Sequence, residues 1–60
     1  PNAKRMNIFA INGKIVVQNA KDVKVYSASG ELVSTAAVTP VEKGLYVVKA
    51  GGKTVKLNVK

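Results

Sequence analysis

Hydrophobic and polar residues alternate along most of the chain, in short runs that turn-forming residues separate. The first two runs, residues 7–11 and 14–18, flank the dipeptide Asn12-Gly13. Asn-Gly favours a two-residue type I′ turn, because both central residues of that turn need a positive φ. The pattern therefore predicts a β-hairpin. Its expected register pairs Ala10 with Ile15 and Ile8 with Val17 on one face, and Phe9 with Val16 on the other.

A second pair of alternating runs, VKVYS and ELVST, lies on either side of residues 28–30. Here we expect a three-residue loop with Gly30 in the left-handed position of a bulge. The four residues before this hairpin, 19–22, have the composition of a turn, because Asn and Asp hydrogen-bond their own backbone and tolerate left-handed conformations. The expected register places Val25 opposite Val33 and Tyr26 opposite Leu32.

A third pair of runs, within residues 44–60, flanks Gly51-Gly52. A two-residue loop at this pair makes one face of the hairpin apolar and the other mixed and basic. A slip of one residue would move lysines into the core, so the register is strongly specified. The expected pairs are Val48 with Val55 and Tyr46 with Leu57 on the apolar face, which Ala50 and Val59 share, and Val47 with Lys56 and Lys49 with Thr54 on the other.

Three hairpins supply about six short strands, and turn signals at this spacing indicate an all-β antiparallel sandwich or a small barrel. Residues 36–43 form a connector between the second and third hairpins. Pro40 cannot donate a hydrogen bond to a strand ladder, so it marks a sheet edge or a crossover that takes the chain to the other sheet. We expect one domain over residues 7–60, after a flexible polar lead-in over residues 1–6.

The composition argues against an enzyme. A chain of 60 residues makes one small domain, and it contains no cysteine and no histidine. It therefore lacks a disulfide, a thiolate metal site, an imidazole base and any nucleophile activated by histidine. The three acidic residues, Asp22, Glu31 and Glu42, are far apart in the sequence. No catalytic residue, cofactor or metal site is predicted.

The net charge is strongly positive, with ten lysine and arginine residues against three acidic residues. Such a balance fits an anionic partner, but the lysines alternate with apolar residues, which also fits solvated sheet faces and edges. Lys56 and Lys60 are four residues apart in the last run, so their side chains should point to the same face of the hairpin. Lys49 lies on this face in the opposite run, and Lys53 is at the tip of the hairpin. A nucleic-acid site is not expected, because the one Phe and two Tyr lie in three different hairpins.

Two further features concern the whole protein. No run of eighteen apolar residues occurs, so we expect no membrane-spanning segment. The chain begins with Pro1 and shows no secretory signal, from which we expect a fragment or processed piece of a larger protein.

The order of the motifs, from VKVYSASGELV to VEKGLYVVKAGGKTVKLNVK, resembles the C-terminal sorting domain of type IX secretion cargo in Bacteroidetes. The resemblance covers roughly residues 12–60, and its order and spacing are more specific than any single piece. That family shows a hairpin followed by a G-x-Y-x-V strand and a short ending rich in glycine and lysine. The matching positions are Val25, Tyr26, Gly30, Leu32 and Val33; Gly44, Tyr46 and Val48; and Gly51, Gly52, Lys53, Lys56 and Lys60.

This resemblance implies a small immunoglobulin-like β-sandwich at the end of a larger exported protein. It implies transit through the periplasm and release at the cell surface or into the medium. The implied partners are the outer-membrane translocation machinery, a sortase-like cysteine peptidase and the parent cargo domain. The family commonly has seven strands, so a six-stranded chain would lack one or take it from a neighbouring molecule. The implied sorting-motif residues are Gly30, Gly44, Tyr46, Gly51, Gly52, Lys53, Lys56 and Lys60.

Other functions remain open on the residues alone. A structural or adhesive β-module that packs on a neighbouring domain predicts a large apolar outer patch. A small basic nucleic-acid-binding barrel predicts salt-dependent binding, and the dispersed aromatic residues argue against it. Exposed edges in so small a sandwich also allow strand exchange, which would give a homo-oligomer.

Overall fold

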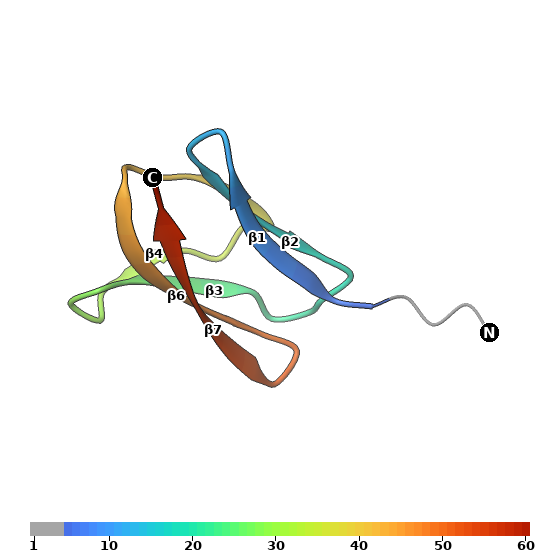
Figure 1. Cartoon of the computed structure of the whole chain (residues 1–60). Helices are drawn as coiled ribbons and strands as arrows, with labels where there is room; N and C mark the ends of the chain where they lie inside the picture. Colours follow the sequence, from blue (N-terminus) through green and yellow to red (C-terminus); the bar gives the residue numbers. More distant parts are fainter. Residues whose placement is uncertain (1–4) are drawn as a thin grey trace.

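Seven β-strands in two antiparallel sheets make up the computed structural model, which describes residues 5–60 (Figure 1). The described residues contain no helix, and thus none with the length and apolar character that crossing a membrane requires. One sheet has the order β1-β2-β5 and the other the order β4-β3-β6-β7. The strands are β1 (Asn7–Ile11), β2 (Lys14–Gln18), β3 (Lys24–Ser27), β4 (Leu32–Ser34), β5 (Val38–Pro40), β6 (Gly44–Ala50) and β7 (Lys53–Val59).

The first and last hairpins form as predicted. Asn12 and Gly13, between β1 and β2, have φ angles of 51° and 72°, as a type I′ turn requires. Gly51 and Gly52, between β6 and β7, have φ angles of 54° and 82°. The structure confirms every cross-strand pair expected in these two hairpins, from Ile8 with Val17 and Ala10 with Ile15 to Val48 with Val55 and Val47 with Lys56.

The register of the middle hairpin agrees with the prediction at one residue pair and differs from it at the other. Tyr26 does face Leu32, but Val25 faces Ser34, and the prediction that it faces Val33 is wrong. A bulge leaves Val33 as the extra residue of β4, where its side chain is 44% exposed. Ser34 is needed next to β5, because its hydroxyl accepts hydrogen bonds from the hydroxyl of Thr39 and the amide of Ala36, both at 3.0 Å.

The segment expected to be a connector contains a strand that the sequence pattern did not reveal. Residues 38–40 form β5, which pairs with β2 and so joins the first sheet. The predicted crossover is confirmed, since the chain passes from β4 in one sheet to β5 in the other. β5 is an edge strand, where the missing N–H of Pro40 costs no ladder hydrogen bond. The described part of the chain thus holds seven strands, and no strand needs to come from another molecule to reach that number.

The strand order is that of an immunoglobulin-like sandwich. With the letters used for that fold, the seven strands in chain order are A, B, C, C′, E, F and G, and the sheets are A-B-E and C′-C-F-G. Tyr46, near the start of β6, donates a hydrogen bond from its hydroxyl to the carbonyl of Glu42 at 2.9 Å. A tyrosine at this corner, bonded to backbone a few residues upstream, is typical of such sandwiches. The fold class therefore agrees with the prediction.

The core lies between the two sheets and consists mainly of valine. The fully or nearly fully buried side chains are Ile15, Val17, Val23, Val25, Val48, Ala50 and Val59. Of the predicted lead-in, residues 1–4 lie outside the described residues. Met6 packs against the core cluster, and the carbonyl of Arg5 accepts a 3.1 Å hydrogen bond from the Asn19 side chain.

Candidate functional site: the C-terminal hairpin and its basic face

The C-terminal hairpin, formed by β6 and β7, brings together seven of the eight residues predicted to form the sorting motif. Gly44 begins β6, and the Gly-Gly pair forms the turn at the far end of the strand. Gly30 lies apart in the β3–β4 turn, where its amide donates to the carbonyl of Ser27 at 2.9 Å. The hairpin residues are Gly44, Tyr46, Gly51, Gly52, Lys53, Lys56 and, directly after β7, Lys60.

The tip of this hairpin is fastened to the rest of the sandwich. The amide of Gly51 donates a 3.0 Å hydrogen bond to the carbonyl of Lys21, in the turn before β3. A Cβ atom at Gly51 would lie only 3.3 Å from the sulfur of Met6, so the turn packs closely against the start of β1. These contacts hold the Gly-Gly turn in place, although turns of this length are usually free at their tips.

The two tyrosines have different surroundings. Tyr46 is on the inner side of β6, where its half-buried ring packs against the core. Its hydroxyl bonds to Glu42 at the rim, as already described. Tyr26 is half-buried on the outer side of β3, opposite Val47. Only Tyr26 therefore contributes to an outer surface.

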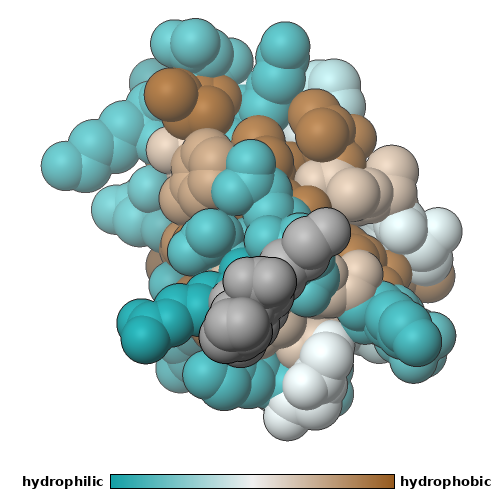
Figure 2. All heavy atoms as spheres, turned by 90° about the vertical axis from the view of Figure 1, so that its right-hand side faces the viewer, coloured by the Kyte–Doolittle hydropathy of each residue, from teal (hydrophilic) through white to brown (hydrophobic). Residues whose placement is uncertain are grey.

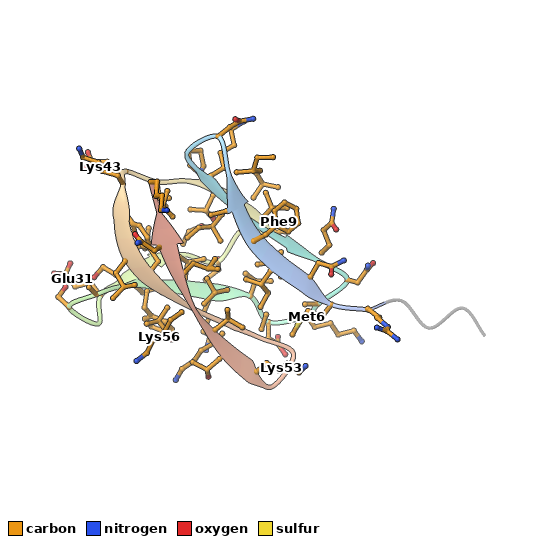
Figure 3. The ribbon with its side chains drawn as sticks, in the orientation of Figure 1. Met6, Phe9, Glu31, Lys43, Lys53 and Lys56 are labelled. Atoms are coloured by element: carbon orange, nitrogen blue, oxygen red, sulfur yellow. The ribbon has the colours of Figure 1, made fainter. Side chains whose placement is uncertain are left out.

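The lysines of the C-terminal hairpin are exposed and reach different parts of its surface. Lys53 stands at the tip, and Lys56 projects from the middle of β7 (Figure 3). The pairing of Val47 with Lys56 and of Lys49 with Thr54 confirms that Lys49 and Lys56 lie on the same face. β7 is the last strand of its sheet, so its outer edge has no strand partner in the described chain.

A lysine outside the hairpin completes this face, and the sequence reasoning did not find it. Lys24 of β3 lies directly opposite Lys49 of β6. We call the outer side of the four-stranded sheet the basic face. It includes Lys24, Tyr26, Val47, Lys49, Thr54 and Lys56. Alternation within β3 places Lys24 and Tyr26 on one side, but no local pattern shows that β3 pairs with β6.

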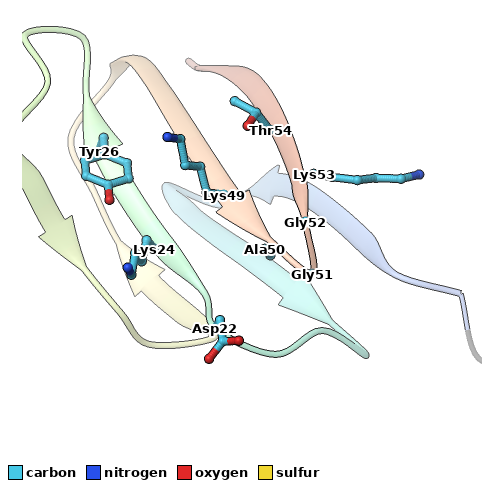
Figure 4. Close-up of a pocket in the computed structure, with 9 residues that line it drawn as sticks. All are labelled: Asp22, Lys24, Tyr26, Lys49, Ala50, Gly51, Gly52, Lys53 and Thr54. Carbon is cyan, nitrogen blue, oxygen red and sulfur yellow. The ribbon is translucent and has the colours of Figure 1, made fainter.

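The basic face contains a shallow depression of about 310 Å³ beside the hairpin tip. Lys24, Tyr26 and Lys49 line it on one side of the sheet, and Asp22 lies at its lower end (Figure 4). The ammonium of Lys49 is 5.7 Å from the centroid of the Tyr26 ring, within the range of a cation–π contact. The side chain of Lys53 points away from this group (Figure 4).

The other sheet has an outer side of opposite character, which we call the apolar face. Its hydrophobic members come from β1, β2 and β5, and their register places Val16 between Phe9 and Val38. Phe9, Ile11 and Val38 are 37%, 53% and 52% exposed. Seen from the side, hydrophobic side chains reach the surface between the hydrophilic ones (Figure 2). The hydrophobic residues of the apolar face are Phe9, Ile11, Val16, Val38 and Pro40, and the polar residues Asn7, Lys14 and Gln18 lie at its two ends.

The described residues hold no group of three or more histidine, cysteine, aspartate or glutamate side chains that could bind a metal ion. What the site offers instead is a fixed strand edge, exposed ammonium groups and one aromatic ring. These groups suit recognition by hydrogen bonding and charge. A scan against protein families, a search of curated proteins and a search of solved structures each found no match to this chain.

Proposed function

We propose that this chain is a non-catalytic sorting domain, which directs a larger exported protein through the outer membrane by the type IX route. The observation that carries the proposal is the C-terminal hairpin. It presents the order Gly44, Tyr46, Gly51-Gly52, Lys53, Lys56 and Lys60 on two long paired strands, fastened at the tip through Gly51. That order is the one by which the sequence resembles the sorting domains.

The geometry of β7 supports recognition of a folded domain. A strand at the edge of a sheet presents backbone N–H and C=O groups to which a partner can add a strand. Lysines along such an edge discourage random pairing and supply charge that a receptor can select. Because the turn at Gly51 is tied to Lys21, a receptor would meet this edge in a fixed orientation.

The partners of the proposal are the outer-membrane translocation machinery and, after translocation, a sortase-like cysteine peptidase that separates the domain from its cargo. The protein would pass through the periplasm and end at the cell surface or in the medium. All of these steps rest on the resemblance of the motif order. In this proposal the domain itself is a recognition signal for export and carries out no reaction.

Charge reversal on the hairpin is the sharpest test of its role. Deletion of residues 53–60 would abolish export but would also unfold the domain, since Val59 is buried at 3% exposure. Lys56→Glu and Lys60→Glu change exposed side chains, so the fold should survive. With a reporter fused to the domain, we expect export to fall several-fold in these variants and to stay normal in Lys14→Glu. Normal export of the two hairpin variants would contradict the role of these lysines.

A second function is favoured by the apolar face. Phe9, Ile11 and Val38 are exposed together on the three-stranded sheet, as expected for a module that packs on a neighbouring domain of its parent protein. In that case the chain would be structural or adhesive, and its hairpin lysines would have no role in export. Loss of domain packing without loss of export, in a variant with Ile11→Ser and Val38→Ser, would favour this second function.

A further inference from the structure

We infer that the basic face is a docking surface for an acidic polypeptide, with Lys24 and Lys49 as its central contacts. The inference does not depend on the sorting function, because it concerns binding at the outer side of the four-stranded sheet. It would hold equally for a structural module. Lys24 is also not one of the residues proposed for the sorting motif.

The first argument is that the face contains an unfavourable pair of like charges. Lys24 and Lys49 are Cα partners on adjacent strands, and like charges in directly opposite positions destabilise a sheet. Lys49 turns toward the ring of Tyr26, with its ammonium 5.7 Å from the ring centroid. The pairing of these two like charges therefore adds nothing to the stability of the sheet. A negatively charged ligand between them would convert the repulsion into attraction.

The second argument concerns the surroundings of the pair. The charged residues that line the depression beside it are Lys24, Lys49, Lys53 and a single carboxylate, that of Asp22. Lys56 adds a third ammonium on β7, across from Val47, so positive charge extends over three neighbouring strands. Together with the net charge of +7, this gives the face a positive field that attracts acidic partners.

The residues next to the lysine pair favour a polypeptide over other anionic partners. Next to the lysine pair runs a row of apolar side chains, Leu32, Tyr26 and Val47, on β4, β3 and β6. A polypeptide can offer carboxylates to the lysines and apolar side chains to this row, since alternate residues of a strand lie about 7 Å apart.

Two other anionic partners fit less well. Single-stranded nucleic acid needs several aromatic side chains on which bases stack, and on this face only Tyr26 is aromatic and it is half-buried. A membrane surface needs apolar side chains that extend deeper than the charged ones. Val47 and Tyr26 are half-buried. Although Leu32 and Leu45 are 56% and 50% exposed on this side, their side chains are shorter than those of the exposed lysines, so the ammonium groups reach a lipid layer first.

Titration of the isotope-labelled chain followed by NMR tests the inference. The probe is a short oligo-glutamate peptide interrupted by single leucines, and the same peptide with glutamine in place of glutamate is its control. We expect the acidic peptide to shift the amide signals of Lys24, Tyr26, Lys49 and Lys56. Lys24→Gln and Lys49→Gln should each weaken binding by about threefold, and Lys14→Gln, on the opposite sheet, should leave it unchanged.

Tighter binding to phosphatidylglycerol vesicles or to oligothymidylate than to the peptide would overturn the inference, as would equal effects of Lys14→Gln and Lys49→Gln. A second measurement needs no ligand. Removing the repulsion by Lys24→Gln leaves the contact between Lys49 and Tyr26 intact, and should raise the melting temperature of the free chain by about 2–5 °C at low salt. A lower melting temperature in Lys24→Gln would contradict the charge repulsion between Lys24 and Lys49, on which the inference rests.

Discussion

The hydroxyl of Tyr46 donates a 2.9 Å hydrogen bond to the carbonyl of Glu42, which fixes the corner where the chain enters β6. Tyr46→Phe removes only this hydroxyl, so it should lower the free energy of unfolding by about 1 kcal/mol. Urea denaturation measures the change. Tyr26→Phe is the matched control, because its hydroxyl has no hydrogen-bond partner within residues 5–60, and an equal loss in both variants would contradict a special role for the corner.

The bulge in the middle hairpin gives the two valines at positions 25 and 33 very different surroundings. Val25 is completely buried, whereas Val33 is 44% exposed. Val25→Ala should therefore cost about 2 kcal/mol of stability, and Val33→Ala less than about 0.5 kcal/mol. Similar costs, measured by denaturant unfolding, would mean that the two valines face each other as the sequence pattern alone predicts.

The turn at Gly51 combines a left-handed backbone with a close neighbour, and two substitutions separate these effects. Gly51→Ala should cost about 1 kcal/mol, because an alanine at a φ of 54° is strained. Gly51→Asn should cost less, since asparagine tolerates this conformation and Asn12 and Asn19 adopt it here. If thermal unfolding shows equal losses, the contact of the new Cβ with Met6 would be the dominant effect.

The hairpin of β1 and β2 carries isoleucines on both of its faces, which allows a matched test of the apolar face. Ile15 is 1% exposed in the core, and Ile11 is 53% exposed on the outer side. Ile15→Ala should cost about 3 kcal/mol, and Ile11→Ala less than about 0.5 kcal/mol in the isolated chain. A large cost at Ile11 would show that the apolar face is covered, for example by a second copy of the chain.

Sequence reasoning succeeded where the structure depends on neighbours in the chain. Asn12-Gly13 and Gly51-Gly52 each join two alternating runs, so the turn and the burial of one face determine the register of both hairpins. The motif residues from Gly44 to Lys60 were expected to form one unit for the same reason, and they share one hairpin.

The features that were missed depend on distant parts of the chain. β5 has three residues and ends in Pro40, so its pattern is too short to distinguish from a connector until β2 offers a partner. Beside the bulge at Val33, Ser34 is hydrogen-bonded to Ala36 and to Thr39 of β5, which lie outside the hairpin. The pairing of Lys24 with Lys49 joins two different hairpins, and local alternation cannot show which strands become neighbours.

Export of a soluble reporter fused to residues 1–60 behind a Sec signal, in a type IX-competent bacterium, tests the proposed function most directly. A strain that lacks the translocon is the control. We predict reporter at the surface or in the medium only when the translocon is present, which would establish these residues as a sufficient sorting signal. Reporter retained in the periplasm, with the domain shown to be folded, would contradict sorting and favour a structural module that packs through its apolar face.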